Sequence, residues 1–425
     1  MTLRLGVALF FSLALSVPAA AQTAPAEDDL PPLGTGPSIQ ATGTLGDYSM
    51  MRDSSGTSWQ PDSAPMEGIH GLLGDWSTMV HGYISAIYDH QGGPRGDDKT
   101  FSSSMLMGMA QHSLGPGHLT LRGMISLDPF MGKSGYPLLL QTGETANGVT
   151  PLVDRQHPHD LFMELAGIYS TPVADGSSAF LYLGYPGEPA LGPPTFMHRF
   201  SAMENPEAPI GHHWLDATHI TYGVVTAGLV YGTLKFEGSV FNGREPDRER
   251  WDFDPLRLDS ASTRISWNPD PNWAFQASYG FIKNPEQLEP DISQHRVTAS
   301  AIYNKKFEHG NWQTTFAWGQ NNQQPGPTSN AYLLESAFGW YAHTIFARAE
   351  NDEKNELFAP GSPLAGRQFD VSKFSVGYIY DIPVAEHLSL GLGAMGSLYA
   401  LPSALTPAYG SSPSSYMLFS RVKLI

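Results

Sequence analysis

The chain has 425 residues and no cysteine, and its 24 Lys and Arg against 41 Asp and Glu give a formal net charge of −17. The lack of cysteine excludes disulfides and thiolate metal sites. The acidic balance argues against nucleic acid as a partner, because that affinity comes largely from Lys and Arg that neutralise phosphates.

The N-terminus has the pattern of a secretory signal peptide. Arg4 precedes the apolar run 5–17, and three alanines, 19–21, form a small-residue cleavage site before Gln22. We therefore expect residues 1–21 to be removed on export. No later stretch reaches the roughly 18 apolar residues that a transmembrane helix needs, so a helical membrane anchor is not expected.

Residues 22–70 show little periodicity and are rich in Pro, Gly, Ser and Asp. This composition is typical of a flexible segment, which would lie in the periplasm. The segment also contains Met50, Met51, Met66 and His70. The alternative interpretation is therefore a plug inside a barrel, or a segment that attracts soft metal ions.

From Trp76 onward, apolar and polar residues alternate in segments of about 9–13 residues, separated by Gly, Pro, Asn and Asp. Alternation with period 2 predicts β-strands, and several of these segments begin or end with Trp or Tyr. The predicted strands begin near Trp76, Thr100, His118, Asp160, Ser177, Thr218, Thr233, Leu258, Asn272, Ile292, Asn311, Asn330, Ala342, Phe369, His387 and Ser415.

These strands predict an all-β fold, a transmembrane antiparallel barrel of about 16 strands (14–18) over residues 71–425. A soluble sandwich is the alternative. Strand length, aromatic strand ends and the export signal favour the barrel, and so do charged residues on the polar face, which a dry core would tolerate poorly. They are Arg122, Lys235, Glu237, Arg264, Arg296, Glu335, Arg348, Arg421 and Lys423. The last segment, 416–425, resembles the closing strand of outer-membrane proteins but ends in Ile425 instead of Phe or Trp.

Residues 154–219 differ from the rest of the chain. Six of the 15 histidines lie within residues 157–219, and imidazole and thioether groups are ligands of zinc and copper. We expect a copper or zinc ion here, with the candidate ligands His157, His159, Asp160, Met197, His198, Met203, His212, His213 and His219. The alternative is that these side chains only hydrogen-bond an irregular loop within the lumen.

Met105, Met107 and Met109 share one face of a predicted strand. If that face points into the lumen, it is a ladder of thioethers; if it points to lipid, it is only apolar surface, since Met is a good apolar filler.

A long loop, 188–217, is expected to fold into or over the lumen, because loops of this length in compact folds are usually functional or disordered. The charged residues expected to line the lumen or its constriction are Asp154, Arg155, Arg199, Glu204 and Glu207. The acidic tract 245–254 is interpreted as a solvated loop.

Enzymatic activity is not expected. The chain has no Gly-x-Ser-x-Gly motif, and the pattern of a phosphate-binding loop fails at Leu127 before Gly132-Lys133-Ser134. A barrel hydrolase remains as an alternative, because Ser and His are plentiful.

Several long motifs carry a resemblance to a known family. They are Asp154-Arg155-Gln156-His157-Pro158-His159-Asp160-Leu161-Phe162, Gly184–Pro194 with Phe196–Arg199, Gly211–Asp216 and Phe241–Asp247. Over roughly residues 55–310 the chain resembles a family of proteobacterial outer-membrane β-barrels that is associated with copper and heavy-metal resistance. The resemblance implies an outer-membrane location in a Gram-negative cell and periplasmic metal-resistance proteins as partners. It supplies no assigned binding residues.

The sequence therefore predicts an outer-membrane channel or binding protein for small solutes or metal ions, in contact with outer-membrane lipid, which handles copper or another heavy metal. A general porin-like channel with structural histidines is the alternative. The permeant solute and the oligomeric state stay open.

Overall fold

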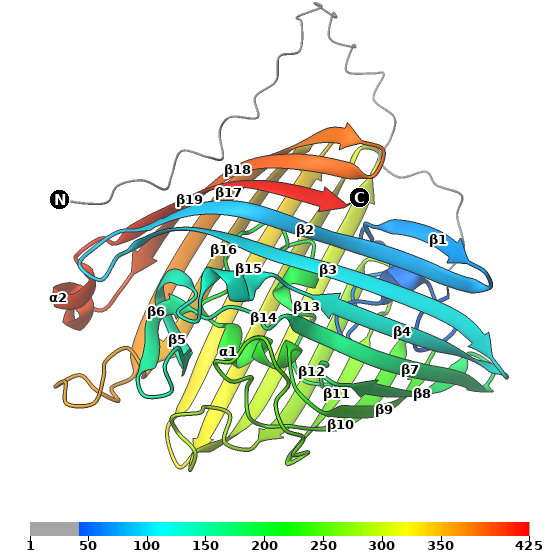
Figure 1. Ribbon diagram of the computed structural model, residues 1–425, viewed down its shortest axis with the longest axis horizontal. Helices are drawn as coiled ribbons and strands as arrows, with labels where there is room; N and C mark the ends of the chain where they lie inside the picture. The colour runs from blue at the N-terminus through cyan, green and yellow to red at the C-terminus, as the bar shows by residue number, and fades with distance from the viewer. Residues whose placement is uncertain (1–41, 425) are drawn as a thin grey trace, which may run out of the picture. The chain divides into compact units, whose positions relative to one another are not determined.

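The computed structural model describes residues 42–424, and Figure 1 shows its ribbon. The predicted signal peptide, residues 22–41 of the predicted N-terminal segment, and Ile425 lie outside the described residues. Within the described part, every helix is too short or too polar to cross a bilayer.

Sixteen antiparallel strands close into a barrel, because the last strand, β19, pairs with the first barrel strand, β2. The barrel strands are β2 (Trp76–Gln91), β3 (Asp98–Leu114), β4 (Gly117–Ile125), β7 (Phe162–Ala174), β8 (Ser177–Gly184), β9 (Val224–Tyr231), β10 (Leu234–Phe241), β11 (Ser260–Trp267), β12 (Trp273–Ile282), β13 (Ser293–Phe307), β14 (Gly310–Gln324), β15 (Thr328–Trp340), β16 (His343–Lys354), β17 (Phe369–Ala385), β18 (Leu388–Ala400) and β19 (Ser414–Leu424). The predicted antiparallel barrel of about 16 strands is confirmed.

Three further strands do not belong to the sixteen that close the barrel, and they were not predicted from the sequence. β1 (Ile69–Leu73) forms a hairpin with the start of β2, and β5 (Tyr136–Thr145) pairs with β6 (Pro151–Gln156). The short helices are η2 (Met50–Arg52), η3 (Asp128–Met131), η4 (Phe196–His198), α1 (His212–Leu215), η5 (Ala217–His219), η6 (Ser403–Leu405) and α2 (Thr406–Tyr409). Among the barrel strands, the largest error in a predicted start is at β9, expected near Thr218 and observed at Val224.

The barrel wall alternates between a polar inner face and an apolar outer face. In β10, Lys235 and Glu237 are buried, whereas Phe236 is 52% exposed and Val240 is 43% exposed. The same alternation buries the charged side chains of β11, β15 and β16 while their apolar neighbours face outward. This is the pattern of a barrel whose outer surface contacts lipid.

The two ends of the barrel differ in their connections. At one end, β3 and β4, β7 and β8, and β15 and β16 are each joined by two residues. At the other end the chain runs through the long connections 126–161, 185–223 and 242–259. In outer-membrane barrels the short turns face the periplasm and the long loops face outward. We name the two ends accordingly.

Connection 185–223, which we call the inward loop, crosses the lumen. It begins against β10 and β12, where the backbone N–H groups of Ala190 and Gly192 donate to Ser239 and Ser278 at 2.8 and 2.9 Å. It continues to the far wall, where Trp214 Nε1 donates to Ser329 Oγ of β15 at 2.9 Å, and Glu207 pairs with Lys373 of β17.

Residues 42–68, which we call the N-terminal segment, also lie against the inner face. Thr57 Oγ1 donates to Glu237 Oε2 at 2.5 Å, and Arg264 donates to the same hydroxyl at 3.0 Å. Further along, Asn304 Nδ2 donates to the carbonyl of Ser63 at 2.7 Å. Two separate parts of the chain therefore fill the lumen, and side chains from both meet those of the wall.

Candidate functional site

Methionine side chains line the inner face of the wall formed by β2 and β3. Met105, Met107 and Met109 are only 3%, 5% and 8% exposed, so their face points into the lumen and not to lipid. The antiparallel register places Met109 opposite Met79 and Met107 opposite His81. Because inward residues recur every second position, the two strands present a continuous row of sulfur and imidazole groups.

Two other parts of the chain lie over this row, and between them and the wall is a partly open cavity of about 90 Å³. This volume exceeds the roughly 10–15 Å³ that one water needs, so the cavity has room for an ion between the side chains that line it. We call it the methionine cavity. Its sulfur and imidazole donors are Met50 and Met66 from the N-terminal segment, Met197, His198 and Met203 from the inward loop, and Met79, His81, Met105, Met107 and Met109 from the wall.

The two imidazoles of the cavity lie close together. His81 Nε2 is 3.2 Å from the sulfur of Met107, and the rings of His81 and His198 are 5.8 Å apart. His198 Nε2 is buried and has no hydrogen-bond partner among residues 42–424. Burial lowers the pKa of His198 to about 3, so its imidazole is neutral, which is the form that binds a metal.

Cations also line the methionine cavity, and each is paired with a carboxylate. The ion pairs are Arg122–Glu164 (2.7 Å), Arg421–Glu204 (2.5 Å) and Lys423–Glu67 (2.9 Å). Since these charges are compensated locally, the cavity does not present an unpaired positive charge that would repel a bound cation.

Five of the predicted histidines form a second group in the lumen, a continuous row of rings. The centroid distances are 5.9 Å for His157–His213, 5.7 Å for His213–His212, 5.1 Å for His212–His219 and 5.3 Å for His219–His159. Phe196 lies 6.3 Å from the ring of His219 and belongs to the same apolar cluster as the buried methionines. The row of histidines therefore adjoins the methionine cavity.

Most of these histidines are oriented through Nδ1. His159 Nδ1 lies 2.8 Å from Asp128 and His212 Nδ1 lies 2.7 Å from Asp216, while His219 Nδ1 bonds the carbonyl of Asp216 at 2.8 Å. Such partners fix ring orientation in metal sites. Burial lowers the pKa of His212, and it lowers the pKa values of His157 and His219 well below the ordinary value. Their rings are therefore neutral.

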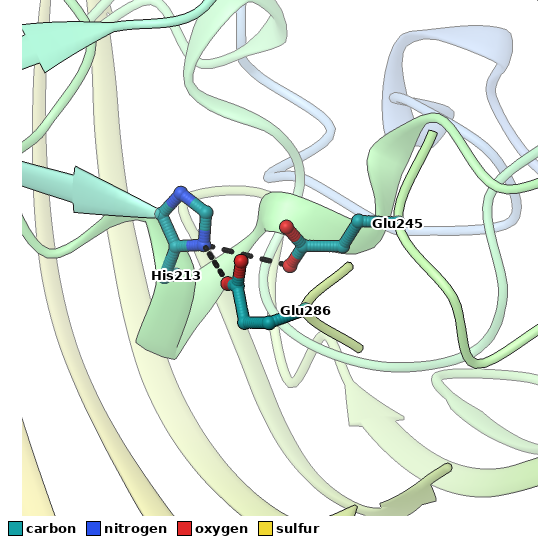
Figure 2. A group of neighbouring side chains, drawn as sticks. All are labelled: His213, Glu245 and Glu286. Atoms are coloured by element: carbon teal, nitrogen blue, oxygen red, sulfur yellow. Dashed lines mark ion pairs between the residues drawn. The ribbon is translucent and has the colours of Figure 1, made fainter. Parts of the chain in front are cut away.

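His213 is the exception, because it faces two carboxylates (Figure 2). Its Nδ1 is 3.4 Å from Glu245 Oε1 and 3.7 Å from Glu286 Oε1. Burial alone would lower the pKa of His213, but Glu245 and then Glu286 raise it above the ordinary value. These three residues come from three different connections between strands.

The nine predicted metal ligands do not form one shell. Met197, His198 and Met203 line the methionine cavity, and His157, His159, His212, His213 and His219 form the row of rings. Asp160 stands apart from both, since its carboxylate accepts from Tyr222 at 2.9 Å and from Arg250 at 3.1 Å. The structure therefore divides the predicted single site into separate groups.

The predicted lumen charges are engaged in ion pairs. Arg199 is fully buried and contacts Glu335 at 2.6 Å and Asp216 at 2.9 Å. The others pair as Asp154 with Arg95, Arg155 with Asp97, Glu204 with Arg421 and Lys423, and Glu207 with Lys373. Arg199, Glu204 and Glu207 thus attach the inward loop to the wall and do not line an open pore.

Sequence reasoning missed several members of these groups. Met79 and His81 are two residues apart on the inner face of β2, and their period-2 spacing beside the Met105 ladder was a usable signal. Glu245 was assigned to a solvated tract, but it is only 9% exposed. Nothing local in the sequence marks Glu245 or Glu286, because they meet His213 only through the folding of three connections.

No protein-family model and no curated protein sequence matches the chain. Solved structures do match: the high-pH structure of Pseudomonas putida OprB has a TM-score of 0.52 at 8% identity, covering 82% of this chain and 94% of that one. Salmonella typhi OmpF in complex with daunomycin has a TM-score of 0.50 at 9% identity, covering 84% of this chain and 100% of that one. At this identity the likeness establishes the fold, a porin-like barrel.

Proposed function

We propose that this porin-like barrel binds a soft monovalent cation of the Cu(I) class in its methionine cavity. The observation that carries the proposal is the lining of the cavity, where eight methionines and two histidines converge. Thioether sulfur selects Cu(I) among biological metals, and imidazole binds copper as well. The chain has no cysteine, so thioethers are its softest donors.

The competing explanation is that methionine only fills space. Two apolar clusters of the barrel allow a comparison. The larger cluster contains 20 buried residues, of which only Met395 and Met417 are methionines. The cluster beside the cavity contains 12 buried residues, of which eight are methionines. Both clusters are buried apolar packing inside the barrel, so the enrichment of methionine near the cavity supports a role for sulfur.

A general diffusion channel is the second candidate, and the porin-like fold favours it. Free diffusion needs an open lumen. Here charged side chains of the inner wall, such as Lys235, Arg348 and Lys373, are at most 1% exposed, because the N-terminal segment and the inward loop cover them. A diffusion channel would require these segments to move away from the wall.

The proposed location is the outer membrane. The apolar outer face fits the lipid of a bilayer, with the short turns on the periplasmic side. In this orientation the N-terminal segment and the methionine cavity lie where ions could be exchanged with periplasmic partners. The proposal assigns binding of the ion to the protein, and no turnover.

The test is a Cu(I) titration of the full chain purified in detergent, under anaerobic conditions and against a chromophoric chelator. The variant Met105→Leu/Met107→Leu/Met109→Leu removes three donors and keeps apolar volume. The matched control is Met395→Leu/Met417→Leu, which changes buried methionines of the other cluster. Heat-modifiable migration on a gel verifies that each barrel is folded.

We expect stoichiometric Cu(I) binding in the wild type and the control, and an affinity at least about 100-fold lower in the triple variant. Equal affinity in all three proteins, or no binding in the wild type, would contradict the proposal. In planar bilayers, a large conductance that is indifferent to the triple substitution would favour the diffusion channel instead.

A further inference from the structure

Three long connections meet at one group of side chains on the outward half of the barrel. His213 lies on α1 within the inward loop, Glu245 lies in connection 242–259, and Glu286 lies in connection 283–292. Figure 2 shows both carboxylates turned toward the imidazole. One donor atom from each residue can be chosen so that all three lie within 4.8 Å of one another.

The distances in this group match those between ligands of one ion. Two ligand atoms that each lie ~2.1 Å from a tetrahedral zinc ion are ~3.4 Å apart. The measured separations from His213 Nδ1 are 3.4 Å to Glu245 and 3.7 Å to Glu286. The separations are longer than those of a normal hydrogen bond, so the ion pairs alone leave space between the three side chains.

A buried carboxylate oxygen in the group lacks a partner. Glu245 Oε2 is buried without a hydrogen bond among the described residues, and Glu245 is at least nine-tenths buried. Leaving such groups unsatisfied is costly. A bound cation would satisfy the carboxylate oxygen and would draw the three side chains together.

The group also borders a cavity of about 30 Å³. This space can hold an ion and a water, since one water needs roughly 10–15 Å³. The cavity is lined by Glu289 and Glu356 as well as by Glu245 and Glu286, and among residues 42–424 Arg296 is the only Lys or Arg in its lining. The local charge therefore favours a cation. With no ion bound, burial and then repulsion from Glu245 raise the pKa of Glu286 well above its usual value.

We propose that His213, Glu245 and Glu286 bind one divalent cation of the zinc class, and that the ion ties the inward loop to two outward connections. Imidazole and carboxylate are borderline and hard donors, which suit zinc and not Cu(I). The site shares no ligand with the methionine cavity, so it does not depend on the function proposed above. Its role is to hold the inward loop across the lumen.

The test is a Zn(II) titration of the metal-stripped full chain, followed by calorimetry, with Co(II) as a spectroscopic probe. The variant Glu245→Gln/Glu286→Gln removes two charged ligands and keeps their shape. The matched control is Glu289→Gln/Glu356→Gln, which removes two carboxylates that line the same cavity outside the ligand group. Gel migration of the unheated barrel verifies folding of each variant.

We expect one Zn(II) per chain in the wild type and the control, and an intense visible Co(II) spectrum typical of tetrahedral coordination. The ligand variant should lose at least about 100-fold in affinity, and the control at most about tenfold, because its two carboxylates only add to the local negative charge. Zinc should also slow hydrogen exchange in residues 242–259 and 283–292 of the wild type and the control, and should leave exchange in the ligand variant unchanged. Equal loss in the control would show a merely electrostatic effect and overturn the proposal, as would the absence of binding in the wild type. Cu(I) binding by the methionine cavity should be the same in both variants.

Discussion

The methionine cavity and the His213 group lie in the same lumen but are built in opposite ways. The cavity takes half of its donors from the rigid wall, where the register of β2 and β3 sets their spacing. The His213 group takes all of its donors from connections between strands. The donors of the methionine cavity are thioethers and neutral imidazoles, whereas the His213 group combines an imidazole with two carboxylates.

This difference separates two tasks that a lumen site can perform. Donors on a strand stay in place when loops move, so the wall half of the methionine cavity keeps its spacing while the donors of the inward loop and the N-terminal segment approach or leave the ion. Donors on three loops come together only when the loops are folded, so an ion bound there stabilises that folded arrangement. From this comparison we infer that the methionine cavity binds an ion reversibly, and that the ion of the His213 group holds the loops together.

The largest effect is expected from Arg199→Met, which should disturb both regions. The side chain of Arg199 is buried between Glu335 and Asp216, and Asp216 in turn orients His212 and His219. Removing one partner of a buried ion pair costs about 3–5 kcal/mol. Urea unfolding should show this loss, and both the Cu(I) and the Zn(II) affinities should fall.

The control for this prediction is Arg257→Met, which removes an exposed arginine from connection 242–259. It should leave stability unchanged within about 0.5 kcal/mol. If Arg199→Met lowered stability but left both affinities intact, the inward loop would not be the shared support of the two sites.

A pair of single substitutions tests whether the two regions are independent. His198→Gln removes one imidazole from the methionine cavity, and Glu286→Gln removes one carboxylate from the His213 group. We expect His198→Gln to lower Cu(I) affinity about tenfold with Zn(II) affinity unchanged, and Glu286→Gln to do the reverse. Both titrations are run on both proteins. Crossed effects in either variant would mean that the two regions form one coupled site.

The barrel and the methionine row could be predicted from the sequence, because both follow from the alternation of side chains between the two faces of a strand. Alternation gave sixteen strands, and it placed Met105, Met107 and Met109 on one face. It could not say which face was inside, since methionine is compatible with both lumen and lipid. That question was decided by the inner position of their cross-strand neighbours, such as Arg122 beside Met109.

The His213 group was not accessible in the same way. Glu245 lies 32 positions after His213 and Glu286 lies 41 positions after Glu245, on connections whose paths no local pattern specifies. The histidines of 154–219 were recognised as unusual, but their division into separate groups depends on buried partners such as Asp128 and Asp216. Short-range sequence patterns therefore predict the strands of the barrel wall, and they do not predict which side chains meet inside the lumen.

The smallest effect is expected from Glu188→Gln, which tests how the N-terminal segment closes the methionine cavity. Glu188 is buried against Gly56 of that segment, where a Cβ would lie 2.6 Å from the Glu188 side chain. Burial raises the pKa of Glu188 to about 8. A carboxyl group with a raised pKa favours the packed state at low pH, and this contribution is lost as pH rises from about 4.5 to about 8.

Hydrogen exchange in residues 50–60, corrected for the intrinsic rate, should therefore be faster at pH 9 than at pH 7 in the wild type, by up to about tenfold. The glutamine variant cannot ionise, so its corrected exchange should be the same at both pH values. Exchange in residues 242–259 should show no such dependence on Glu188, because Glu188 packs against the N-terminal segment and not against that connection. If the wild type and the variant responded to pH alike, another group would control the docking of the N-terminal segment. In that case the closing of the methionine cavity would be set by the ion pair of Lys423 with Glu67, which joins the same segment to β19 at 2.9 Å.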